Sequence, residues 1–171
     1  LAPFAKFNSV TFEENSSKVI GMISNENEKL KEFAKNDHFS TYVYISNKET
    51  ESNSCISIEN WEAGNKILGN YFLESNNIGK FRPLELNYDK LRVSFDKGCY
   101  RGQEIVARMK YLGIDRRSFL TFITTSKYDA NENIKIVGKQ IEIDDKLVFN
   151  AIVKKNLIPD IQKYPQVLKI I

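Results

Sequence analysis

The apolar positions of the chain follow two different spacings, and the first third of the sequence mixes them. Alternating apolar residues predict strands at residues 10–13, 19–23 and 42–45. Between the second and third of these, Ser24 or Asn25 begins a predicted helix that runs to about Lys35, with Leu30 and Phe33 on its apolar face. The order strand, strand, helix, strand is typical of a compact α+β module.

The later part of the chain predicts two helices and five strands. Residues 58–63 begin a short helix, residues 91–95 alternate like a strand, and residues 103–112 form a helix with Gly113 as its C-cap. Four more strands are predicted at residues 117–124, 134–143, 147–153 and 167–171. Short strands at this spacing are typical of a small antiparallel β-barrel or β-sandwich. We therefore expect an α+β protein, with a central α+β module at residues 1–57, a connecting segment at residues 58–115 and a C-terminal barrel at residues 116–171.

Composition narrows the possible classes of function. The chain has 171 residues, of which 42% are hydrophobic and 27% are charged, as in an ordinary globular protein. Its two cysteines, Cys55 and Cys99, fit neither a disulfide framework nor a metal site of usual spacing. His38 is the only histidine, which nearly excludes histidine triads and two-histidine metal sites. We expect a cytoplasmic monomer in a reducing setting, with no metal and no membrane partner.

The positive charge is concentrated in one short segment. Residues 97–117 contain six cations and two acids and so carry +4, whereas the remaining 150 residues of this +3 chain carry −1. Such a concentration favours an anionic partner, either nucleic acid or a small carboxylate or phosphate. A solvated face with internal ion pairs is the alternative.

The same segment opens with KGCYRGQE, residues 97–104, which places a cysteine in an unusual setting. Two glycines and two cations surround Cys99: Gly98, Gly102, Lys97 and Arg101. The glycines allow positive φ and close approach of a ligand, and the helix predicted to begin near Gln103 directs free amides toward the loop. These amides and cations favour the thiolate of Cys99 over the thiol, whose ordinary pKa is about 8.5. A small buried thiol in a glycine-rich turn is the alternative.

KGCYRGQE, followed by Ala107 and Arg108, resembles the signature of the YgfZ family of folate-binding, tRNA-modifying proteins. These are relatives of the glycine-cleavage T-protein, an aminomethyltransferase. The likeness extends upstream to FAKFNSVTF (residues 4–12), NWEAG (60–64) and FRPLELN (81–87), and downstream to residues 116–117. Family members are longer, and the N-terminal segment that builds much of their folate-binding domain has no counterpart before Leu1.

The resemblance implies a fold, a cofactor and partners. The fold would be that of the T-protein, with ferredoxin-like α+β modules before the small barrel, and residues 58–115 would be the signature-bearing segment of the folate-binding domain. The full-length protein would bind tetrahydrofolate or another folate. It would act as an accessory factor, rather than a conventional enzyme, in the synthesis or repair of iron–sulfur enzymes, including one that thiomethylates tRNA. Because a cluster needs about four ligands, a single cysteine would act as a transient ligand or by thiol exchange.

The candidate site residues follow from the signature. Cys99 is the expected reactive group, and five neighbours are expected to shape its site: Lys97, Tyr100, Gln103, Glu104 and Arg108. Glu104 and Arg108 stand one helical turn apart and can pair, and Glu104 could instead hold a ligand amine. Candidate cofactor contacts are Gly98, Gly102 and Glu104. Trp61 is either a stacking surface for the folate or a core side chain.

Two other functions fit the same residues. The relationship to the T-protein favours a folate-dependent aminomethyl or methyl transferase, although the T-protein lacks this cysteine signature and carries its catalytic carboxylate in the part absent here. The basic segment at residues 97–117 favours a tRNA-binding module, although Tyr100 and Tyr111 are its only aromatic residues.

Overall fold

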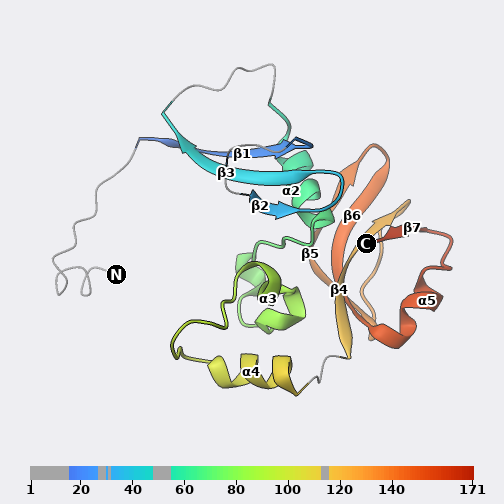
Figure 1. The fold of residues 1–171 in the computed structure, drawn as a ribbon. Coiled ribbons are helices and arrows are strands. Elements are labelled where there is room, and N and C mark those ends of the chain that lie inside the picture. The colour runs from blue at the N-terminus through green and yellow to red at the C-terminus, as the bar shows by residue number, and fades with distance from the viewer. Residues whose placement is uncertain (1–15, 27–29, 31, 48–54, 113–115) are drawn as a thin grey trace.

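The computed structural model describes residues 16–26, 30, 32–47, 55–112 and 116–171. These residues form two antiparallel sheets, a helix between them, and a helical segment that leads into the second sheet (Figure 1). The expected α+β class is confirmed. The ferredoxin-like modules, the T-protein-like fold and the domain boundaries stay predictions.

The first sheet has the strand order β1-β3-β2. Its strands are β1 (Lys18–Ser24), β2 (Glu32–Lys35) and β3 (Ser40–Ser46). Asn36 shapes the turn between β2 and β3, because its Oδ1 accepts hydrogen bonds from the backbone N–H groups of His38 and Phe39. The predicted strands at residues 19–23 and 42–45 are confirmed, and the one at residues 10–13 lies outside the described residues.

The helix predicted from Ser24 to Lys35 is wrong at both ends. Ser24 closes β1, and residues 32–35 pair with β3 through a register shift between Glu32 and Ala34. The helical spacing of Leu30 and Phe33 is outweighed by the open edge of β3, which supplies backbone partners for this segment.

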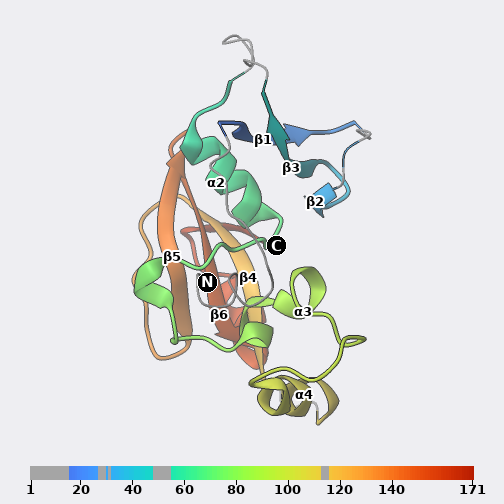
Figure 2. The same ribbon diagram turned by 90° about the vertical axis from the view of Figure 1, so that its left-hand side faces the viewer.

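Helix α2 (Ile58–Ile67) lies between the two sheets (Figure 2), which confirms the helix predicted to begin near residue 58. Ser57 is its N-cap and accepts a hydrogen bond from the backbone N–H of Asn60 at 3.2 Å. One side of α2 packs on β1, where Gly21 leaves room for the Trp61 ring; a Cβ at position 21 would lie only 2.9 Å from that ring. The other side buries Ala63 against the second sheet.

A buried polar cluster fixes the last turn of α2 to the second sheet. The carbonyl oxygen of Lys66 accepts hydrogen bonds from the Thr121 hydroxyl and, at 3.0 Å, from the Asn150 amide. The Asn150 amide also donates to the Thr121 hydroxyl at 2.8 Å. Thr121 and Asn150 are at most 2% exposed, so each of these groups depends on the others for its hydrogen bonds.

The segment after α2 is helical rather than extended. It contains η2 (Ser75–Asn77), η3 (Pro83–Leu86), α3 (Tyr88–Leu91) and α4 (Gln103–Tyr111). The strand predicted at residues 91–95 is wrong, because the backbone N–H groups of Arg92 and Val93 both donate to the Tyr88 carbonyl. The Arg92 guanidinium lies over the rings of Tyr88 and Phe72, 5.0 Å from each centroid, instead of alternating along a strand. The predicted helix at residues 103–112 is confirmed as α4, and Gly113 lies outside the described residues.

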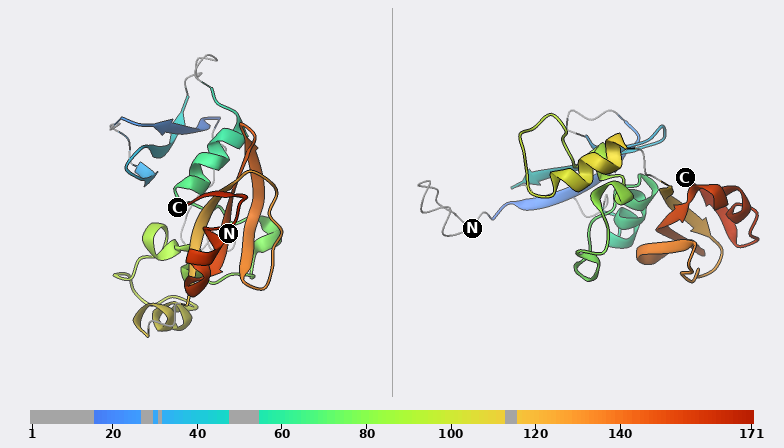
Figure 3. Two further views of the ribbon diagram at one scale, coloured as in Figure 1. Left: turned by 90° about the vertical axis from the view of Figure 1, so that its right-hand side faces the viewer. Right: turned by 90° about the horizontal axis from the view of Figure 1, so that it is seen from below.

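The second sheet has the strand order β5-β6-β4-β7. Its strands are β4 (Arg117–Thr124), β5 (Ile134–Ile143), β6 (Lys146–Lys154) and β7 (Val167–Ile170), with η4 (Lys155–Leu157) and α5 (Ile158–Ile161) before β7 (Figure 3). All four predicted strands are confirmed. The predicted barrel is wrong, because β5 and β7 are the edges of an open sheet. Its core is centred on Phe122 and Phe149, whose rings stack with centroids 5.2 Å apart.

One irregularity in β5 faces α2. Gly138 has φ +72 and lies where the register of β5 against β6 shifts between Val137 and Ile141. A Cβ at this glycine would lie 2.5 Å from the Glu74 carboxylate, so only glycine fits. The bulge turns Lys139 toward Glu62 of α2, and their side chains form an ion pair at 2.6 Å.

Asn150→Ala is expected to lower the free energy of unfolding by about 2 kcal/mol, because the Lys66 carbonyl and the Thr121 hydroxyl each lose one of their buried hydrogen bonds. Urea denaturation of the two proteins measures this change. Asn133→Ala is the control, since Asn133 bonds Lys154 at the surface, and it should change stability by less than about 0.5 kcal/mol. An equally small effect at Asn150 would show that the cluster does not anchor α2.

Candidate functional site

The signature loop lies at the end of the molecule opposite the first sheet, where it leads into α4 (Figures 1 and 2). Cys99 is exposed to solvent and is a free thiol. The alternative of a small buried thiol in a glycine-rich turn is therefore wrong. A thiol in this position can reach a protein or small molecule without any rearrangement of the core.

A reciprocal pair of hydrogen bonds shapes the turn that follows Cys99. The Gln103 side-chain oxygen accepts from the backbone N–H of Tyr100 at 3.2 Å, and the Gln103 backbone N–H donates to the Tyr100 carbonyl, also at 3.2 Å. Gly102 has φ +88 and is the N-cap residue of α4. The turn thus needs a glycine at position 102 and a hydrogen-bonding side chain at position 103.

Gly98 does not have the positive φ that the sequence analysis allowed for. It is not among the described glycines with positive φ, and a Cβ added to it would meet nothing within 4 Å. Its backbone conformation therefore does not require glycine, unlike that of Gly102.

The charged neighbours of the thiol are held at the surface. The Lys97 ammonium lies 4.5 Å from the centroid of the Tyr100 ring. Glu104 and Arg108 form the predicted ion pair at 2.7 Å, with side chains 76% and 67% exposed. A pair so exposed contributes about 0.3–0.5 kcal/mol to helix stability, so its chief effect is to occupy the Glu104 carboxylate.

Trp61 does not join this cluster. It lies in the first turn of α2, where its ring packs over Gly21 of β1, whereas α4 lies at the other end of the molecule (Figures 1 and 2). Its ring lines two pockets. One, of about 830 Å³, is bordered by β1, β3 and residues 55–58, and the other, of about 260 Å³, lies between α2, residues 70–74 and Lys139.

Sequence reasoning missed the charged residues of the smaller pocket, which include Glu62, Lys66, Glu74 and Lys139. Lys66 is only 5% exposed, and burial lowers the pKa of its ammonium below that of an ordinary lysine. Nothing in the local sequence marks it, since a lysine near a helix C-terminus is normally solvated.

The described part of the chain offers neither a metal centre nor a membrane span. Among its residues, no three His, Cys, Asp or Glu side chains group closely enough to hold a metal ion. None of the described helices has the length and apolar character to cross a bilayer.

No protein-family model matches the chain. A curated "Uncharacterized protein" of Haemophilus influenzae is 28% identical over 146 residues, which are 84% of this chain and 50% of that protein. A "tRNA-modifying protein YgfZ" of Klebsiella pneumoniae is 31% identical over 117 residues, which are 60% of this chain and 36% of that protein. A protein of the same name from Colwellia psychrerythraea is 49% identical over 47 residues, which are 27% of this chain and 14% of that protein. The chain thus spans half or less of the length of these relatives.

Both cysteines are expected to react with a thiol reagent in the folded protein, because both are exposed. Labelling with 5,5′-dithiobis(2-nitrobenzoic acid) in native buffer should release nearly the same amount of thiolate as labelling in denaturant. Cys99→Ser should halve the native signal, and Cys55→Ser, the matched control, should leave the Cys99 reaction unchanged. Protection of Cys99 in the native protein would contradict the open position of the loop.

Proposed function

The chain is related to the YgfZ family of tRNA-modifying proteins, and we propose that it is part of an accessory factor that supports iron–sulfur enzymes of tRNA modification in a folate-dependent way. Cys99 is its reactive group. The observation that carries this proposal is the free thiol of the signature, which is presented to solvent in a loop fixed by Tyr100 and Gln103.

An accessory role suits the setting of the thiol better than turnover of a small substrate does. Enzymes exclude water from the reacting atoms. Cys99 is exposed instead, and it does not line any of the three pockets described in the structure. A solvent-facing thiol is suited to transient ligation of a cluster or to exchange with a thiol on a partner protein. In that role the partner supplies the remaining ligands and covers the site.

The folate is proposed for the full-length protein, with Trp61 as the chain's own contribution to its site. The Trp61 ring borders the larger pocket together with apolar side chains of β1 and β3, which offer a surface for a flat ring. The folate site and Cys99 are then at different ends of the described structure, so the folate acts on the thiol through a partner or through the rest of the protein. A folate-dependent aminomethyl or methyl transferase would instead require the folate to reach its reacting group directly.

Cys99→Ala is expected to abolish function while leaving the fold intact. In Escherichia coli that lacks its own YgfZ protein, the full-length gene that encodes this chain should restore thiomethylated adenosine in tRNA, measured by mass spectrometry of nucleosides. The Cys99→Ala gene should give no more than the deletion strain. Cys55→Ala removes another exposed cysteine outside the signature and should restore activity. Full activity of Cys99→Ala would rule out a role for the thiol.

A second candidate function is direct contact with tRNA through the basic segment. In the structure a further aromatic residue, Phe95, lies beside the basic segment. The Lys110 ammonium lies 3.3 Å from the centroid of the Phe95 ring. The Phe95 ring also contacts the Tyr111 ring edge-on, with centroids 6.5 Å apart. Tyr111 is 71% exposed. Cations beside exposed rings are typical of surfaces that bind single-stranded nucleic acid.

Binding to tRNA by this surface is expected to weaken steeply as salt is raised. Arg108→Gln and Lys110→Gln together should make the slope of log affinity against log salt shallower by about 0.7–0.9 for each phosphate that the variant no longer neutralises. Filter binding at several salt concentrations measures the slope. Lys163→Gln, which changes an exposed lysine paired with Asp160, is the control. Binding that is undetectable or insensitive to salt would remove this candidate.

A further inference from the structure

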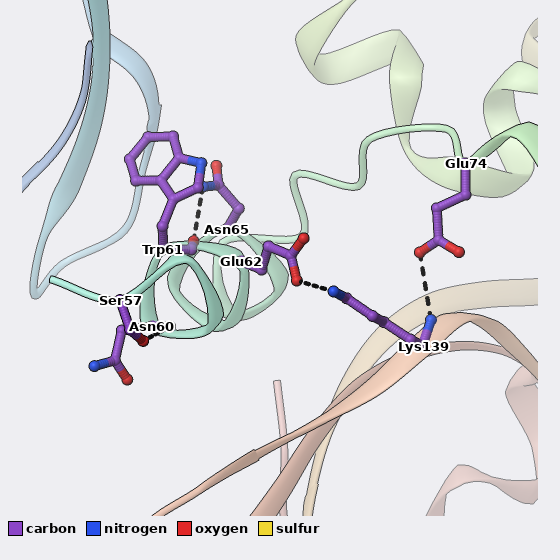
Figure 4. Close-up of polar contacts among 7 residues, drawn as sticks. All are labelled: Ser57, Asn60, Trp61, Glu62, Asn65, Glu74 and Lys139. Atoms are coloured by element: carbon purple, nitrogen blue, oxygen red, sulfur yellow. Dashed lines mark hydrogen bonds and ion pairs between the residues drawn. The ribbon is translucent and has the colours of Figure 1, made fainter.

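The smaller pocket contains a buried cation that makes no ion pair with the described residues. It lies between α2, the turn at residues 70–74 and the β5 bulge, and its volume is about 260 Å³. Figure 4 shows Glu62 of α2 and Glu74 each in contact with Lys139 of β5. The Lys66 side chain lines the pocket, and the Lys66 residue is only 5% exposed. Within the described residues its ammonium makes no ion pair; its one aromatic neighbour is Tyr71, whose ring centroid is 5.7 Å away.

An uncompensated ammonium in such a place is costly, because burial removes its water without replacing it. Burial is the main cause that lowers the pKa of Lys66, and the carboxylates of Glu74 and Glu62 only partly oppose it. The pocket therefore contains a positive charge that an anionic group would satisfy.

The two carboxylates of the pocket differ in how they are occupied. Glu62 pairs with the Lys139 ammonium at 2.6 Å, and this hydrogen bond raises the pKa of Lys139. Glu74 makes no ion pair within the described residues; its Oε1 accepts only a long hydrogen bond, 3.4 Å, from the Lys139 backbone N–H. Lys66 and Glu74 are thus opposite charges that line one pocket without touching.

Apart from Asn65 and Asn70, which hydrogen-bond to each other, the uncharged wall of the pocket is mostly apolar. Its main apolar side chains are Ile58, Trp61 and Phe72. Phe72 is held in place by the Arg92 guanidinium, 5.0 Å from its ring centroid. A ligand that fits this wall must carry a hydrocarbon group as well as two charges. A simple anion would leave Glu74 unpaired and repelled, and a simple amine would leave Lys66 unpaired.

We propose that this pocket binds a free α-amino acid with an aliphatic side chain. The carboxylate pairs with Lys66, the ammonium pairs with Glu74, and the side chain lies against Trp61 and Phe72. Two charge-assisted contacts and an apolar wall together favour the complete amino acid over a molecule that carries only the carboxylate or only the ammonium. This site is separate from Cys99, and it shares Trp61 with the larger pocket proposed for the folate.

Three probes with the same hydrocarbon group test the proposal: L-leucine, 4-methylpentanoate, which lacks the amine, and 3-methylbutylamine, which lacks the carboxylate. Calorimetric titration measures their affinities, and Trp61, the only tryptophan of the chain, reports binding at the pocket by its fluorescence. L-Leucine is expected to bind at least about tenfold more tightly than either of the other two.

Substitutions assign each charge to its residue. Lys66→Met should weaken L-leucine binding about tenfold and bring it level with that of 3-methylbutylamine, and Glu74→Gln should bring it level with that of 4-methylpentanoate. Lys163→Met, which is outside the pocket, should leave all three affinities unchanged. The proposal is overturned if L-leucine gives no saturable binding, or if Lys66→Met binds it as tightly as the original protein.

Lys66→Met should fold, because the Lys66 carbonyl keeps its bonds to Thr121 and Asn150 whatever the side chain. Without ligand it should melt above the original protein at neutral pH, since the folded state no longer buries a charge. Because the folded-state pKa of Lys66 is lowered, this advantage is present below that pKa and fades as pH rises toward the ordinary lysine value of about 10.4. The charged groups facing it, Glu62, Glu74 and Lys139, are unchanged in the variant. Melting at or below the original protein would show that the ammonium is already satisfied.

Discussion

The carbonyl oxygen of Lys66 determines where α2 lies, and α2 determines the rest of the arrangement. This one acceptor, in the last turn of the helix, receives hydrogen bonds from Thr121 of β4 and Asn150 of β6. Both side chains are buried, so any other placement of the helix would leave polar groups without partners in the core. Apolar packing between α2 and the sheet is less directional and would tolerate sliding. The polar cluster therefore defines the position that the apolar contacts stabilise.

With its end fixed, α2 makes a different contact on each of its sides. Trp61, at the start of the helix, meets β1 at Gly21, so the first sheet is positioned by a ring packed on a bare backbone. Glu62 faces the β5 bulge and pairs with Lys139 there. The same bulge needs glycine at position 138, because Glu74 and Tyr71 occupy the space of a side chain. The smaller pocket is thus a consequence of how three segments meet.

Elements whose structure depends on neighbouring residues along the chain were predicted correctly from the sequence. Elements whose structure depends on contacts with distant segments were not. Periodicity was enough for α2, α4 and the strands of the second sheet, and the turn geometry of Gly102 followed from its place before a helix. The predictions for residues 32–35 and 91–95 were wrong because an open strand edge and the stacking of Arg92 outweighed local spacing. The burial of Lys66 could not be predicted, since it arises from residues 70–74 and β5 closing over a residue that is ordinary in sequence.

The two candidate sites differ in what the fold provides for them, and this difference indicates how each one works. Around Lys66 the chain supplies a concave surface, buried charge and apolar walls, which together suit recognition of a small molecule without help. Around Cys99 it supplies an exposed thiol on a rigid turn, with Glu104 already paired to Arg108. The turn fixes the orientation of this thiol, but the thiol remains solvated. In the proposed accessory role, chemistry at Cys99 would therefore begin only when the surface of a partner covers the loop and completes the site.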